Sequence, residues 1–204
     1  MHEGDVTGMG HGTNTPKTSK LVFRMKHPAV FFDRDGTLNP DPGYISDPDQ
    51  LILFPEVPEA LARLRKAGFC LVLVTNQSGL ARKIIPPLRL CQIHNKLQTA
   101  LSQADAQFDR IYVCPHHPDF PQGSKPCGCR KPAPGLALKA IADLNLDPGR
   151  SFMVGDRASD MEMAIAAGLF PVMVRREDGP SVPGVVVVPH LGAAADFIIT
   201  RHRP

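Results

Sequence analysis

Residues 29–37 read Ala-Val-Phe-Phe-Asp-Arg-Asp-Gly-Thr, and this stretch decides the fold. Its four apolar residues predict a buried strand that ends at Asp33. Side chains alternate along an extended chain, so we expect Asp33 and Asp35 on the same side, at the mouth of a sheet. Burying two carboxylates so close together is costly unless a cation lies between them, and Mg²⁺ prefers such oxygen ligands. A surface Asp-x-Asp turn is the alternative, but the apolar strand before it and Gly36-Thr37 after it favour the buried site.

Strand-like and helix-like segments alternate through the rest of the chain. Apolar runs predict strands at 70–74, 111–113, 151–154, 172–174 and 185–188. Apolar residues at helical spacing predict helices at 58–67, 93–101, 137–144, 159–167 and 191–199. This alternation predicts an α/β fold of the Rossmann-like type, with a parallel sheet covered by helices on both faces. Ligands of such folds bind beyond the carboxyl ends of the strands.

Polar residues follow two more of the predicted strands. Residues 75–78, Thr-Asn-Gln-Ser, bring a hydroxyl and successive amides that could hold phosphate oxygens, although a threonine in this place is more often a helix cap. Asp156 follows the strand at 151–154 and is a candidate third acidic metal ligand, with a helix N-cap as the alternative role. Arg130 and Lys131 lie between these segments and could neutralise a phosphoryl group during transfer.

A second group of candidate ligands surrounds a short polar segment. Cys114 and His116 precede it, and Cys127 and Cys129 end it. Three sulfurs and an imidazole predict a tetrahedral zinc site, and four protein ligands leave no open position for catalysis, so we expect this zinc to be structural. His117 is the alternative to His116. Core-lining cysteines are disfavoured because proline, glycine and histidine surround them.

These motifs occur in order at strand ends: Asp33-x-Asp35-Gly-Thr, then Thr75, Lys131, and Gly155-Asp156 with Asp160. In them the chain resembles the haloacid dehalogenase superfamily of phosphatases, from about residue 29 to residue 175. The resemblance implies that Asp33 is the nucleophile and that Asp35 is the general acid and then the base. It implies that Thr75 and Lys131 hold the phosphoryl group. Its Mg²⁺ would be bound by the Asp33 carboxylate, the Asp35 backbone carbonyl and Asp156.

The zinc loop narrows this resemblance to a small subfamily with a minimal cap. Its members act on sugar phosphates or on histidinol phosphate, and Gly43-Tyr44 resembles the sugar branch more closely. The resemblance implies a heptose with two phosphates as substrate, cleaved at C7, while histidinol phosphate or a broader set of sugar phosphates stays open. The segment 83–87 and Arg157 depart from the usual pattern. Substrate-binding residues would be Asp41, Gly43, Tyr44, Asn76, Gln77, Ser78 and Arg130.

Length and composition are those of a globular protein. The chain has 204 residues, of which 43% are hydrophobic and 21% charged, with a net charge of +3. The basic residues are dispersed, so we expect no nucleic-acid partner, and no apolar run approaches the roughly 20 residues of a membrane span. Residues 1–20 lack the apolar stretch of a signal peptide. We therefore expect a disordered tail at 1–26, one domain at 27–204 with the zinc loop at 114–129, a monomer, and a cytoplasmic location.

A different class of function also stays open. The chain could be a zinc-stabilised binding module that has lost catalysis, but such a module has no physical need to gather carboxylates at one place. A nucleic-acid 3′-phosphatase would share the Asp-x-Asp chemistry, yet it would need a basic groove that the sequence does not indicate.

Overall fold

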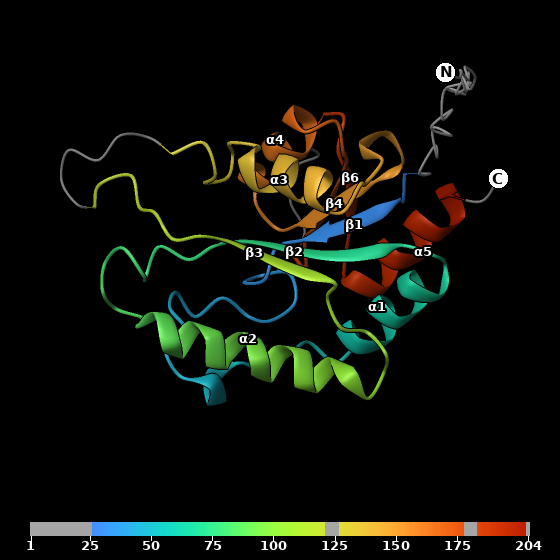
Figure 1. Ribbon diagram of the computed structural model, residues 1–204. Helices are drawn as coiled ribbons and strands as arrows, with labels where there is room; N and C mark the ends of the chain where they lie inside the picture. The colour runs from blue at the N-terminus through green and yellow to red at the C-terminus, as the bar shows by residue number, and fades with distance from the viewer. Residues whose placement is uncertain (1–25, 121–126, 178–182, 203–204) are drawn as a thin grey trace, which may run out of the picture.

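The computed structural model describes residues 26–120, 127–177 and 183–202. The expected tail at 1–26 therefore lies outside the described residues except for Lys26, as does the middle of the expected zinc loop. In the described part of the chain, six parallel strands form one sheet in the order β3-β2-β1-β4-β5-β6 (Figure 1). The strands are β1 Ala29–Phe32, β2 Cys70–Asn76, β3 Arg110–Cys114, β4 Phe152–Gly155, β5 Phe170–Val174 and β6 Val186–Val188.

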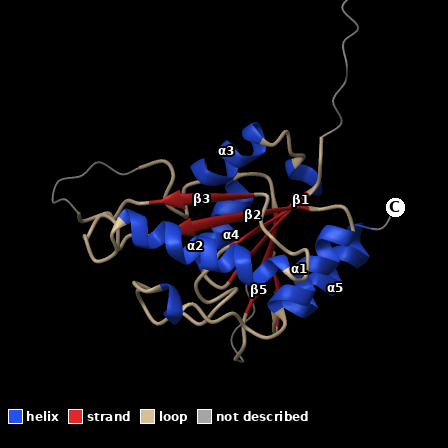
Figure 2. Ribbon diagram, turned by 60° about the horizontal axis from the view of Figure 1, so that its bottom comes forward, coloured by secondary structure: helices blue, strands red, loops and turns tan. Residues whose placement is uncertain are grey.

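Helices cover both faces of the sheet, which confirms the predicted α/β class. They are α1 Val57–Lys66, α2 Pro87–Ser102, α3 Gly135–Asp143, α4 Ala158–Ala166 and α5 Leu191–His202. Figures 1 and 2 show α1 and α5 side by side at one end of the sheet. Two 3-10 helices, η1 Pro48–Gln50 and η2 Pro148–Arg150, lie in the connections.

The alternation of side chains along β1 separates two hydrophobic clusters. Val30 and Phe32 belong to a cluster with buried residues of α1, α2 and α5. Ala29 and Phe31 belong to the cluster formed with α3 and α4. All four β1 side chains are fully buried, because a central parallel strand is covered on both faces.

The order of the strands creates a candidate ligand-binding crevice at the carboxyl ends of β1 and its neighbours. β1 lies between β2 and β4, and the order of the strands reverses there. Loops that leave the carboxyl ends of these neighbouring strands diverge, which creates a crevice at this point. The connection from β1 to α1 contains only η1, so the expectation of a minimal cap is confirmed. None of the described helices is long and apolar enough to cross a bilayer.

Candidate active site

Three carboxylates meet at the carboxyl edge of the sheet. Asp33 follows β1, Asp156 follows β4, and Asp160 lies in the first turn of α4. One oxygen from each lies within 4.8 Å of the others. Asp33 and Asp160 are buried, and the backbone N–H of Arg157 donates to Asp160 at 3.0 Å. Three carboxylates this close together repel one another and need positive charge nearby.

Lys131 supplies part of that charge. Its Nζ lies 2.8 Å from Oδ1 of Asp33 and 2.7 Å from Oδ1 of Asp160, and it donates to the carbonyl of Val74 at 3.1 Å. Burial lowers the pKa of Lys131, but the two carboxylates outweigh it and raise the pKa above its ordinary value. Burial raises the pKa of Asp33 to about 6, with Lys131 opposing the rise and Asp160 adding to it.

The remaining charge fits a hard divalent cation. The Arg157 guanidinium lies 3.8 Å from Asp156, so three carboxylates face two cations and an excess of negative charge remains. Oxygen donors are the ligands that Mg²⁺ prefers. Gly36, with φ of 88°, brings the backbone close to Asp156, where a Cβ would lie 2.2 Å from a carboxylate oxygen. Thr37 Oγ1 donates to Asp156 at 3.0 Å and orients it.

The side chain of Asp35 has a different environment from that of Asp33. Arg34 forms a bidentate pair with it, from Nε at 2.9 Å and from a terminal nitrogen at 2.7 Å. Asn39 and Gln77 each donate one further hydrogen bond at 3.0 Å. Burial raises the pKa of Asp35, but these four hydrogen bonds and the Arg34 charge outweigh it and hold the pKa below its ordinary value. The cation that pairs with the Asp35 carboxylate is thus the Arg34 guanidinium, and a metal ion between the two aspartates stays a prediction.

Residues at the end of β2 form hydrogen bonds that hold Lys131, Asp35 and Thr75 in place. Asn76 exchanges two hydrogen bonds with the backbone of Lys131, at 3.1 and 3.2 Å, and so fixes the segment that carries the lysine. Gln77 donates to the hydroxyl of Thr75 at 2.9 Å as well as to Asp35. The predicted substrate residues Asn76 and Gln77 therefore already have structural contacts.

A pocket of about 480 Å³ opens above these groups. Asp33, Asp35, Thr75 and Lys131 line it, and Arg130 and Arg157 add two more cations to its wall. Arg157 forms an ion pair with Asp41 across the pocket, and Arg82 donates to the hydroxyl of Tyr44 at 2.8 Å. Every residue predicted to bind substrate is part of the lining, namely Asp41, Gly43, Tyr44, Asn76, Gln77, Ser78 and Arg130.

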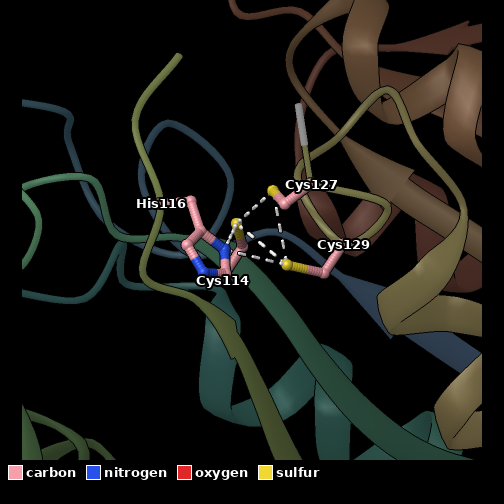
Figure 3. A group of neighbouring side chains, drawn as sticks. All are labelled: Cys114, His116, Cys127 and Cys129. Carbon is pink, nitrogen blue, oxygen red and sulfur yellow. Dashed lines mark hydrogen bonds between the residues drawn. The ribbon is translucent and has the colours of Figure 1, made fainter. Parts of the chain in front are cut away.

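The four predicted zinc ligands lie together in a cluster (Figure 3). The three Sγ–Sγ distances among Cys114, Cys127 and Cys129 are 3.3, 3.5 and 3.7 Å, and Nδ1 of His116 lies 3.3 and 3.6 Å from two of the sulfurs. A tetrahedron with Zn–S bonds near 2.3 Å has edges of about 3.8 Å, so the cluster has the dimensions of a metal site. His117 uses its Nδ1 to accept from the Asp119 backbone and is not part of the cluster.

Comparison with known proteins agrees with this arrangement. The family model of the haloacid dehalogenase-like hydrolases matches residues 40–168, which is more than half of the chain. The chain belongs to this family. Among its relatives, the D-glycero-beta-D-manno-heptose-1,7-bisphosphate 7-phosphatase of Yersinia pestis is 40% identical over 84% of this chain and 89% of its own. The enzyme of that name from Escherichia coli K12 is 39% identical over 84% and 88%.

Solved structures of family members superpose on most of the chain. A D,D-heptose 1,7-bisphosphate phosphatase from B. bronchiseptica, complexed with magnesium and phosphate, has a TM-score of 0.77 and 35% identity, covering 85% of this chain and 99% of its own. A putative haloacid dehalogenase-like phosphatase from Mesorhizobium loti has a TM-score of 0.78 and 34% identity, covering 90% and 91%.

Some residues of this family site are not evident from the sequence. Arg34 reads as a spacer between two aspartates, yet its side chain is only 1% exposed and clamps Asp35. His94, on α2, has no role that the motifs predict, although its imidazole contacts Arg34. A histidine on the apolar face of a helix is the available signal, because Ile93 and Leu97 of the same face are buried. Asp160 stands out in the sequence only as part of the family motif.

Proposed function

We propose that the protein is a phosphatase that removes the C7 phosphate of D-glycero-D-manno-heptose 1,7-bisphosphate. The observation that carries the proposal is the pairing of Asp33 with Lys131 at the floor of a pocket that two arginines also line. A carboxylate beside a fixed ammonium is suited to attack phosphorus while the cation balances the charge of the phosphoryl oxygens. Relatives about 40% identical carry the name of this activity.

In the proposed reaction, the Asp33 carboxylate attacks the C7 phosphorus and the bond to the sugar oxygen breaks. An aspartyl phosphate forms on Asp33, and Asp35 donates a proton to the leaving alkoxide. Water then attacks the aspartyl phosphate, Asp35 takes its proton, and phosphate leaves. Lys131 and the Thr75 hydroxyl hold the phosphoryl oxygens in both steps.

The environment of Asp35 determines when it can act as an acid. Four donors surround its carboxylate and lower its pKa, so the resting group is ionised. The first step needs the protonated form. A dianionic phosphate beside the carboxylate raises its pKa, because like charges disfavour ionisation. Proton uptake by Asp35 therefore accompanies substrate binding in this proposal.

We assign the Mg²⁺ ligands to the Asp33 carboxylate, the backbone carbonyl of Asp35, and Asp156. Asp160 lies within reach of the same place, but its pair with Lys131 gives it a second role in holding the lysine. When bound, Mg²⁺ would stabilise the negative charge that develops on the phosphoryl group.

The second phosphate of the substrate is assigned to Arg130. This arginine lines the pocket, and one of its nitrogens donates to the carbonyl of His116 at 3.1 Å, which leaves other donors of the guanidinium for a ligand. Binding energy from a remote phosphate orients the reacting one, so we expect Arg130 to affect kcat/KM. Histidinol phosphate has no second phosphate to make this contact, and it remains the alternative substrate together with a broader set of sugar phosphates.

The cysteine–histidine cluster is proposed to hold structural zinc. Four protein ligands leave no open position, and the contact from Arg130 to His116 joins the cluster to the pocket wall. Zinc would thus fix the position of Arg130. A monomeric state, a cytoplasmic location and the single domain at 27–204 remain predictions.

Phosphate release tests the proposal. Purified protein with Mg²⁺ should release one phosphate from heptose 1,7-bisphosphate and leave heptose 1-phosphate, and Asp33→Asn should abolish the release without changing the fold. Turnover by Asp33→Asn close to that of the wild type would contradict the assignment of the nucleophile.

A further inference from the structure

Arg34 is among the largest fully buried side chains of the described residues. Its guanidinium contacts the side chains of three other residues. Two of its nitrogens bind Asp35, and one of these, Nη2, also donates to Oε1 of Gln77 at 3.3 Å. The other terminal nitrogen, Nη1, lies 3.4 Å from Nε2 of His94. A buried guanidinium is costly unless its donors are paired, so each of these contacts constrains its orientation.

His94 is the acceptor in this contact. Arginine has only donors, so Nε2 must carry a lone pair, and the proton of the neutral ring must be on Nδ1. Burial and the Arg34 charge lower the pKa of His94 to about 4, with Asp35 opposing the shift. The imidazole is therefore neutral at pH 7, as the acceptor role requires.

The packing of α2 does not need a histidine at this place. Leu90, Ile93, Leu97 and Leu101 form the buried apolar face of the helix. An apolar side chain at position 94 would continue that face without any cost for burying a polar ring. The presence of a histidine at position 94 is therefore explained by its contact with Arg34 rather than by the packing of α2.

We propose that His94 is a positioning residue for the general acid. His94 accepts from Nη1 of Arg34 and so fixes the orientation of the guanidinium. The other two nitrogens of that guanidinium bind Asp35, so its orientation determines how the Asp35 carboxyl faces the leaving oxygen. The inference rests on the proposed phosphatase reaction, in which Asp35 protonates that oxygen. Without His94, Nη1 of Arg34 is a buried donor with no acceptor, and the guanidinium turns to find one.

The test compares two leaving groups in the same folded variants. A sugar alkoxide needs a proton as it leaves, whereas p-nitrophenolate leaves readily without one. The quantity kcat/KM reports only the steps up to the aspartyl phosphate, so it excludes the later role of Asp35 as a base. The assay measures kcat/KM with Mg²⁺ on heptose 1,7-bisphosphate and on p-nitrophenyl phosphate, for wild type, His94→Leu, His94→Gln and the matched control Ile93→Val.

The inference expects a loss that depends on the leaving group. His94→Leu should lower kcat/KM for the bisphosphate by about a hundredfold, as for other misplaced catalytic groups, and leave p-nitrophenyl phosphate nearly unchanged. His94→Gln retains an acceptor and should recover most of the loss, and Ile93→Val should resemble the wild type on both compounds. Equal losses on both substrates, or no loss, would overturn the inference alone. No phosphate release by the wild type from either compound would overturn the proposed function and this inference with it.

Discussion

The Nζ atom of Lys131 lies 2.8 Å from an oxygen of Asp33, in a place where both side chains are buried. In the proposed reaction, this pair explains how buried Asp33 can serve as the nucleophile near neutral pH. Burial alone favours the protonated acid, and the ammonium opposes that tendency, so that the pKa of Asp33 is raised only to about 6. At pH 7 most of Asp33 is therefore ionised.

Lys131→Met should abolish activity and destabilise the fold. The substitution keeps much of the side-chain volume but leaves Asp33 and Asp160 as buried carboxylates without their cation, and breaking such a pair costs about 3–5 kcal/mol. Urea unfolding in buffer without added Mg²⁺ measures the loss. Lys139→Met is the control, because it removes an exposed lysine paired with exposed Asp143 and should change the free energy of unfolding little. Equal stability of the two variants would contradict the account of Lys131.

His94 should make the fold sensitive to mild acid. The pKa of His94 is about 4 in the folded protein and near 6.5 in the unfolded chain, so between these values the unfolded state binds more protons. Its contribution to stability is present above pH 6.5 and is lost as the pH falls toward 4. Between pH 7 and pH 5 this loss amounts to about 2 kcal/mol.

The measurement is urea unfolding at pH 7 and pH 5 for wild type and His94→Gln. Other groups titrate in both proteins, so the difference between the two pH dependences reports His94. The variant should lose about 2 kcal/mol less than the wild type over this interval. Parallel pH dependences would show that the imidazole is not held neutral.

The cysteine–histidine cluster should bind about one zinc per chain, with a free energy of ~10–16 kcal/mol near pH 7. Cys127→Ser should lower the zinc content and also kcat/KM for the bisphosphate, because Arg130 is bonded to the backbone of His116 within the cluster. Elemental analysis of protein purified without chelators measures the metal. The matched control is Cys91→Ser, an exposed cysteine on α2 outside the cluster, which should retain zinc and activity. Wild-type protein without zinc would refute the assignment.

Arg130→Ala should reduce the preference for a substrate with two phosphates. A charge-assisted hydrogen bond contributes ~1.5–3 kcal/mol, so kcat/KM for the bisphosphate should fall roughly 10- to 150-fold relative to that for a monophosphate. Arg110→Ala removes an exposed arginine at the amino end of β3, away from the pocket, and serves as the control. A loss of the same size on both substrates would mean that Arg130 does not bind the second phosphate.

Much of the fold could be predicted because hydrophobic patterns are local. The apolar run at 29–32 and the helical spacing at 58–67 each predict one element, and the structure has β1 at Ala29–Phe32 and α1 at Val57–Lys66. The alternation of such elements predicts a parallel sheet. Strand ends then indicate the place of the site, since parallel strands bring their carboxyl ends to one edge. On this basis the residue pattern predicts Asp33, Asp156 and Lys131 as members of one site, and the three side chains do lie together at that edge.

The contacts that orient these groups could not be predicted in the same way. Arg34 alternates with Asp33 along the chain, so periodicity places its side chain on the opposite face and does not predict that it turns back to bind Asp35. His94 lies 60 residues from Arg34 in the sequence, and only the packing of α2 brings the two together. Pairings of this kind depend on tertiary geometry, which residue spacing does not encode.

The central claim is that this site cleaves a heptose bisphosphate through Asp33. Its most direct test is kcat/KM for phosphate release from D-glycero-D-manno-heptose 1,7-bisphosphate and from histidinol phosphate, measured with Mg²⁺ on wild type and on Asp33→Asn. The account predicts that the wild type strongly prefers the bisphosphate and releases its C7 phosphate, and that Asp33→Asn releases none from either compound. A wild-type preference for histidinol phosphate, or turnover that survives in Asp33→Asn, would contradict it.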